Sequence, residues 1–251
     1  MSRINLMRNR FILAFIILCL FLASIAYSGS IVNSRHDMIH VTYADPTMDI
    51  GGIPAYINDY NKEICVYCHT PHNANTMAPL WNRNTPAGPY GIYNSSATMD
   101  AATGQPNGLS LACLSCHDGT IAVDSIINQP SSGLIATPGW HYQMKLLGPD
   151  NCGLCHTGAI GSGHDSRASY LGIDLSDDHP ISIDYNDLTT QFGTEFNTPP
   201  DLSRGWPGND IKLYFGYVEC PSCHDVHDPD IPPFLRISNA DSALCTKCHM
   251  K

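Results

Sequence analysis

Cys65-Val66-Tyr67-Cys68-His69-Thr70-Pro71-His72 contains the pattern C-x-x-C-H, followed by a second histidine three residues later. In this pattern two thiols can form thioether bonds to the edge of a porphyrin, and the adjacent imidazole can bind the iron from one face, so C-x-x-C-H is the attachment signature of a c-type haem. The pattern occurs five times, and its residues are Cys65, Cys68, His69, Cys113, Cys116, His117, Cys152, Cys155, His156, Cys220, Cys223, His224, Cys245, Cys248 and His249. Because the five motifs use all but Cys19 of the 11 cysteines, the sequence predicts five covalently bound c-type haems, each with its iron.

Zinc ribbons, thioredoxin-like dithiols and disulfides are the alternatives for C-x-x-C pairs. A zinc ribbon needs its pairs in matched couples, and five is an odd number. None of the three alternatives requires a histidine directly after every second cysteine. The repeated histidine therefore favours haem attachment.

The first residues of the chain predict export. Arg3, Arg8 and Arg10 precede an apolar run over 11–26, and small residues follow where a peptidase could cut. We expect a signal peptide over 1–26, which would take Cys19 with it, and a mature haem domain over 27–251. The run is shorter than the roughly 20 residues of a membrane span, although an uncleaved anchor is the alternative. We expect membrane contact only during export, which suits a cofactor attached outside the cytoplasm.

The charge of the chain excludes some partners. Residues 1–26 hold three of the 13 basic residues and none of the 23 acidic ones, so the remainder has a formal charge of −13. Haem propionates would make it more acidic. Nucleic acid is therefore not an expected partner.

The composition predicts a loop-rich fold. The mature chain provides about 45 residues for each haem, and 20 Gly and 18 Pro are scattered along a sequence without a long apolar stripe of helical period. We expect mostly irregular structure, with short α-helices at and just before the motifs, wrapped around a chain of five haems. The sequence predicts helices over Ile211–Cys223 and Asp241–His249, and an extended segment over Ile181–Tyr185 that pairs with another strand.

The second axial position of each iron separates an electron carrier from a catalyst. Seven histidines lie outside the motifs, which suffices for two imidazoles on every iron; they are His36, His40, His72, His141, His164, His179 and His227. His72 and His227 each follow a motif histidine by three residues, a span of at most about 10 Å. This is too short to reach the opposite face of the same porphyrin. As ligands, both would serve a neighbouring haem.

The sequence predicts that residues 134–170 form an insert that carries the third motif. His141 precedes this motif and His164 follows it, within a glycine-rich stretch. One of them is expected to complete the third iron, and the sequence does not choose between them. It leaves a similar choice between His36 and His40 near the mature N-terminus.

Several stretches together carry a family resemblance. They are Ser34-Arg35-His36-Asp37, Cys65–Ala74, Cys113–Thr120, Asp174–Ser182, Cys220–His227 and Cys245–His249. In this order they resemble the doubled C-x-x-C-H domain proteins, small extracellular multihaem cytochromes that polymerise into conductive filaments. The pattern of that family has four haems, so the insert with Cys152–His156 is a departure from it.

The resemblance implies a loop-rich fold around bis-histidine haems that alternate between stacked and crossed pairs. It also implies that His179 is an iron ligand. In such filaments a histidine of one subunit ligates a haem of the next, and His36 is the expected donor in a head-to-tail polymer of identical subunits. The protein would then be secreted, extracellular or on the cell surface, and would exchange electrons with other redox proteins or extracellular acceptors.

Three functions follow from these patterns. We expect electron transfer without enzymatic activity, as a filament subunit; a monomeric periplasmic electron shuttle is the alternative. A multihaem reductase is the third hypothesis, and it needs an iron with an open position and acid or base groups beside it. No variant haem motif marks such a site.

Overall fold

The computed structural model describes residues 29–32, 34–37, 63–94, 99–121, 125–129 and 171–250. The predicted signal peptide, the insert over 134–170 and His40 lie outside the described residues. The third motif and its two expected ligands, His141 and His164, lie in that insert and are therefore not described either.

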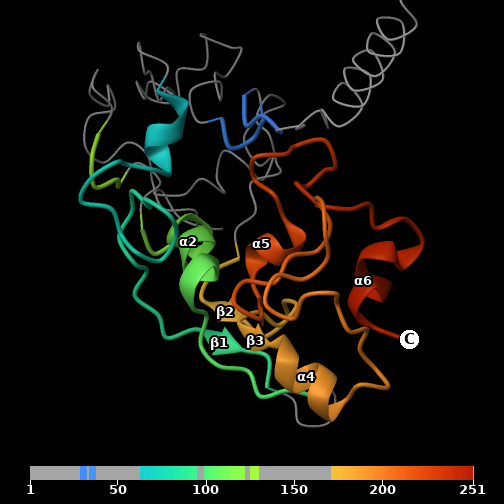
Figure 1. Cartoon of the computed structure of the whole chain (residues 1–251). Coiled ribbons are helices and arrows are strands. Elements are labelled where there is room, and N and C mark those ends of the chain that lie inside the picture. Colours follow the sequence, from blue (N-terminus) through green and yellow to red (C-terminus); the bar gives the residue numbers. More distant parts are fainter. Residues whose placement is uncertain are drawn as a thin grey trace, which may run out of the picture.

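Short helices mark the four described motifs, as Figure 1 shows. They are the 3-10 helix η1 (Ile64–Tyr67), α2 (Gly108–His117), α5 (Cys220–Cys223), and η2 (Ala240–Ser242) followed by α6 (Ala243–Cys248). Loops connect them, so the predicted loop-rich fold with short helices at the motifs is confirmed.

The longest of these helices, α2, has local reasons for its extent. Leucine and alanine, which favour helix, fill much of its sequence GLSLACLSCH. It ends at Asp118, and Gly119 follows with φ +73°, the left-handed conformation in which glycine commonly ends a helix. The helix therefore ends just after His117, and the motif occupies its last turn.

Two small sheets connect distant parts of the chain. Strand β1 (Gly91–Ile92) runs parallel to β2 (Asp174–Leu175), and β3 (Ile183–Asp184) runs antiparallel to β4 (Tyr217–Val218). The extended pairing predicted within 181–185 is therefore confirmed at β3. The helix α4 (Tyr185–Gln191) follows β3 directly, and the Asp184 carboxylate caps it by accepting from the backbone N–H of Asn186, at 2.9 Å.

The predicted helix over 211–223 is wrong for most of its length. Only Cys220–Cys223 is helical, and β4 lies just before it. Phe215 and Gly216 have φ values of +56° and +90°, which a continuous right-handed helix cannot contain. The prediction over 241–249 is confirmed, although Asp241 (φ +53°) and Ser242 (φ +63°) separate η2 from α6 by a kink.

Buried apolar side chains form two small clusters. One consists of Ile183, Tyr185, Leu188, Phe196 and Leu213, and the other of Tyr90, Leu114 and Leu175. The first cluster surrounds α4 and the second holds α2 against β2. They fix the ends of the sheets to the helices that carry the motifs.

In the part of the chain that the structure describes, no helix is both long and apolar enough to cross a membrane.

Candidate haem-binding sites

The eight described motif cysteines are all free thiols. No group of three or more metal-binding side chains gathers within the described residues. Burial raises the pKa of the Cys68 thiol to about 12 and that of Cys223 to about 11. These cysteines are therefore neutral thiols at ordinary pH.

Three pairs of imidazoles face one another, and each combines a motif histidine with a histidine outside the motifs. The ring centres of His69 and His227 are 6.2 Å apart and nearly parallel, at 19°. Those of His36 and His117 are 6.0 Å apart at 76°, and those of His179 and His249 are 6.5 Å apart at 72°.

The separations fit an iron between the two rings of each pair. Metal–imidazole bonds are about 2 Å long, and a ring nitrogen lies about 1 Å from its ring centre, so two axial imidazoles have centres about 6 Å apart. All three pairs match this value within 0.5 Å. The donor set of each pair, two imidazoles with thiols beside one of them, suits a c-type haem.

Backbone carbonyls orient several of these imidazoles. The Nδ1 atom of His69 is 2.7 Å from the Pro79 carbonyl, that of His224 is 2.9 Å from Pro233, and that of His179 is 2.9 Å from Pro180. A carbonyl oxygen only accepts, so Nδ1 carries the proton in each ring. This leaves Nε2 as the metal-binding nitrogen, an arrangement typical of ligating histidines.

His36 lies in a buried environment within its own chain. Its ring packs at 4.6 Å on Phe234, and its Nδ1 atom has no hydrogen-bond partner among the described residues. Burial, with the nearby charges of His117, His227 and His224, lowers its pKa from 6.5 to about 4. At neutral pH the ring is therefore in the uncharged form that binds metal.

The His36 ring lies beside His117 of its own chain, on α2. Its expected role as the donor to a haem of the next subunit stays a prediction.

Two further histidines are not brought to a second imidazole. His72 is exposed, and His224 is half-buried beside the Pro233 carbonyl. Within the described ranges no ring contact is found for either of them.

The second and fourth motifs contact each other. The helices α2 and α5 lie side by side in Figure 1. The thiol of Cys113 is hydrogen-bonded with that of Cys220, which raises the pKa of Cys113 and lowers that of Cys220. The Ser110 hydroxyl oxygen accepts from the Cys220 backbone N–H at 3.0 Å. Two haems attached at these motifs would pack against the same pair of helices, α2 and α5.

Glu219 lies at the centre of this contact and is only 3% exposed. Its carboxylate accepts from the hydroxyls of Ser110 and Ser182, the latter at 2.9 Å. Burial raises its pKa, and the serine hydroxyls oppose that rise. Its backbone N–H donates to the Ser222 hydroxyl at 2.8 Å, as part of a capping box that begins α5.

The first and second motifs are also connected, through Ser115. Arg83, at 1% exposure, donates to the Ser115 carbonyl at 2.9 Å and to its hydroxyl at 3.2 Å. The indole N–H of Trp81 donates to the same hydroxyl at 3.3 Å, and the Trp81 ring lies edge-on to His69 at 5.7 Å.

Sequence reasoning missed Arg83, Phe234 and Phe196, the last of which packs at 5.0 Å on His249. Only their contacts identify them, because a single Arg or Phe in a loop has no spacing that marks it.

Comparison with known families finds a match over residues 216–251 to the model described as "Doubled CXXCH motif". This segment contains the fourth and fifth motifs. A search of curated proteins finds no match. The matched pair of motifs, together with the free thiols and facing imidazoles of the other sites, supports a multihaem c-type cytochrome that binds haem covalently and transfers electrons.

Proposed function

We propose that the chain carries five bis-histidine c-type haems and transfers electrons outside the cell, as the repeating subunit of a filament. The observation that supports it is the set of three facing pairs, His69 with His227, His36 with His117 and His179 with His249. An iron held by two imidazoles has no open position for a substrate. Such an iron can therefore exchange electrons but cannot bind a substrate.

The haem supplies a one-electron couple when bound. The residues of this chain hold it in place: thiols fix the porphyrin edge, two imidazoles fix the axial positions, and backbone carbonyls fix the imidazoles. These groups are held by short helices and by contacts such as Ser110 with Glu219. Little of the site therefore needs to move when the haem iron gains or loses an electron. The Cys113–Cys220 contact and the Ser115 contacts bring neighbouring attachment sites together, which favours electron transfer between haems.

The haem count and ligation are tested on the purified, fully matured protein. Mass spectrometry and the pyridine haemochrome spectrum should give five covalent haems per chain. Resonance Raman spectra of the assembled filament should be entirely six-coordinate low-spin, without binding of carbon monoxide to the reduced filament. Four haems or fewer would contradict the proposal, and so would a large high-spin fraction.

For the filament, His36, whose ring lies beside His117, and His72 are both candidate donors to a neighbouring subunit. His72 is exposed and faces no described imidazole, so we propose it as the ligand that crosses the subunit interface. Electron cryo-microscopy of material sheared from the cells would test this. Discrete monomers would instead favour the periplasmic shuttle.

A reductase is the second candidate, and His224 is the observation that favours it. If no second imidazole meets the iron of the fourth haem, that iron has an open position. Carbon monoxide binding to one haem in five would support this candidate over a simple carrier.

A further inference from the structure

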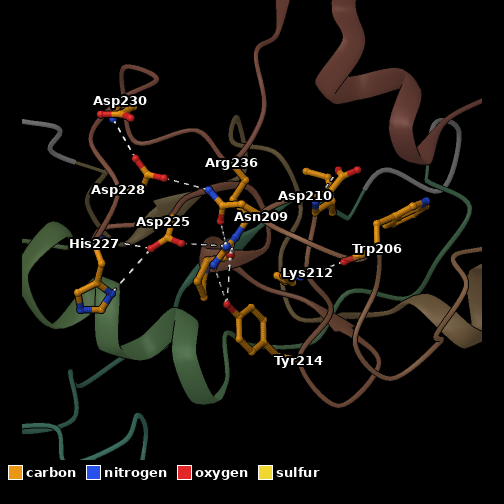
Figure 2. Close-up of polar contacts among 12 residues, drawn as sticks. Trp206, Asn209, Asp210, Lys212, Tyr214, Asp225, His227, Asp228, Asp230 and Arg236 are labelled. Carbon is orange, nitrogen blue, oxygen red and sulfur yellow. Dashed lines mark hydrogen bonds and ion pairs between the residues drawn. The ribbon is translucent and has the colours of Figure 1, made fainter. Parts of the chain in front are cut away.

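Arg236 occupies the centre of a polar network between the fourth motif and His227 (Figure 2). Its side chain is 9% exposed. The guanidinium donates to four acceptors, and they are the Pro221 carbonyl at 2.8 Å, the Asn209 amide oxygen at 3.0 Å, Asp225 Oδ2 at 3.0 Å and the Tyr214 hydroxyl at 3.1 Å. Pro221 lies between the two cysteines of the fourth motif, so Arg236 holds that attachment loop directly.

Asp225 extends the network to His227. Its Oδ1 atom accepts from the His227 backbone N–H at 3.1 Å and lies 3.8 Å from His227 Nδ1. Figure 2 shows the imidazole on one side of Asp225 and Arg236 on the other. The carboxylate thus lies between the Arg236 guanidinium and Nδ1 of His227, whose ring centre is 6.2 Å from that of His69.

We propose that Asp225 and Arg236 are positioning residues that set the reduction potential of the first haem through His227. The inference rests on the proposed function, because it requires an iron between His69 and His227. A carboxylate beside the outer nitrogen of a ligating imidazole makes the ring a stronger electron donor and favours the ferric state. Arg236 limits this effect by neutralising the carboxylate and holding it in one orientation.

The two residues have opposite charges, so their removal has opposite effects. Asp225→Asn removes a negative charge near the ligand, and the potential of the first haem should rise. Arg236→Gln removes the positive charge and leaves the carboxylate unpaired, so the same potential should fall. Arg236→Lys keeps the charge and should restore the potential toward that of the wild type. If the two residues had a purely structural role, both charge-removing variants would shift the potential of the first haem in the same direction.

The experiment is a spectroelectrochemical titration of the five-haem protein and its three variants. Each shift should affect about one fifth of the absorbance change, because one haem of the proposed five is involved. Asp201→Asn and Arg204→Gln are the matched controls, since both side chains are exposed and Asp201 caps a similar local turn. Opposite shifts in one haem, absent from the controls, are the expected result.

Shifts in the same direction, or no shift beyond the controls, would overturn the inference. If Arg236→Gln does not mature, Asp225→Asn and Arg236→Lys still decide, because the first must raise the potential and the second must preserve it. A haem count other than five in the wild type would contradict the proposed function instead. The two failures are therefore distinguishable.

Discussion

The imidazoles of His69 and His227 lie 6.2 Å apart and within 19° of parallel, although the two residues are far apart in the sequence. His227, which follows His224 by three residues, therefore lies beside the histidine of the first motif and not beside that of its own. The first and fourth attachment sites are consequently neighbours in space.

The angles between facing rings predict two classes of low-spin iron. Nearly parallel imidazoles give a rhombic electron paramagnetic resonance signal, whereas nearly perpendicular ones give a strongly anisotropic signal. His69 with His227 should give the first type, and the pairs at 76° and 72° should give the second. Low-temperature spectra of the oxidised protein check this. A single class of signal from all haems would contradict the three geometries.

His227→Ala and His72→Ala form a matched pair, since each histidine follows a motif by the same offset. His227→Ala should create one high-spin haem in the isolated monomer, because it removes the ring that faces His69. His72→Ala should leave the spin state of the monomer unchanged and should impair assembly. Resonance Raman spectra and negative-stain microscopy give the two readouts. A new high-spin haem in the His72→Ala monomer would assign that ligand within the chain.

Glu219 gives stability a dependence on pH. Its folded-state pKa is raised above the usual 4.5 by burial, so its protonated form favours folding. This contribution is fully present below pH 4.5 and is lost as the pH rises through the raised value. Glu219→Gln should accept the same two serine hydroxyls and lose this dependence. Denaturant unfolding at several pH values checks it, with the exposed Asp187→Asn as control. A pH profile unchanged by Glu219→Gln would refute the assignment.

Arg83→Met should destabilise the chain. Arg83 is 1% exposed, and its loss removes charged hydrogen bonds to Ser115. Each such bond contributes about 1.5–3 kcal/mol. Unfolding followed in the haem Soret band should show this loss, whereas Arg204→Met, at the surface, should change stability little. Equal stability of the two variants would show that the Ser115 contacts contribute nothing.

The sequence by itself determined the attachment chemistry. Cysteine and histidine at fixed spacing are required because thioether bonds and an axial ligand must come from one short peptide, so a local pattern suffices to identify them. It also determined the loop-rich fold, since glycine and proline are frequent and no long apolar stripe is present. The pairing of β3 and the helix over η2 and α6 followed from equally local signals.

Only the tertiary structure decided which histidine faces which motif. A distal imidazole is set by packing between residues far apart in the chain, and no spacing records it. His36 illustrates this, because its ring packs on Phe234 and lies beside His117 on α2. Arg236 and Arg83 likewise become visible only through their partners, since a buried cation is recognised by the acceptors that surround it.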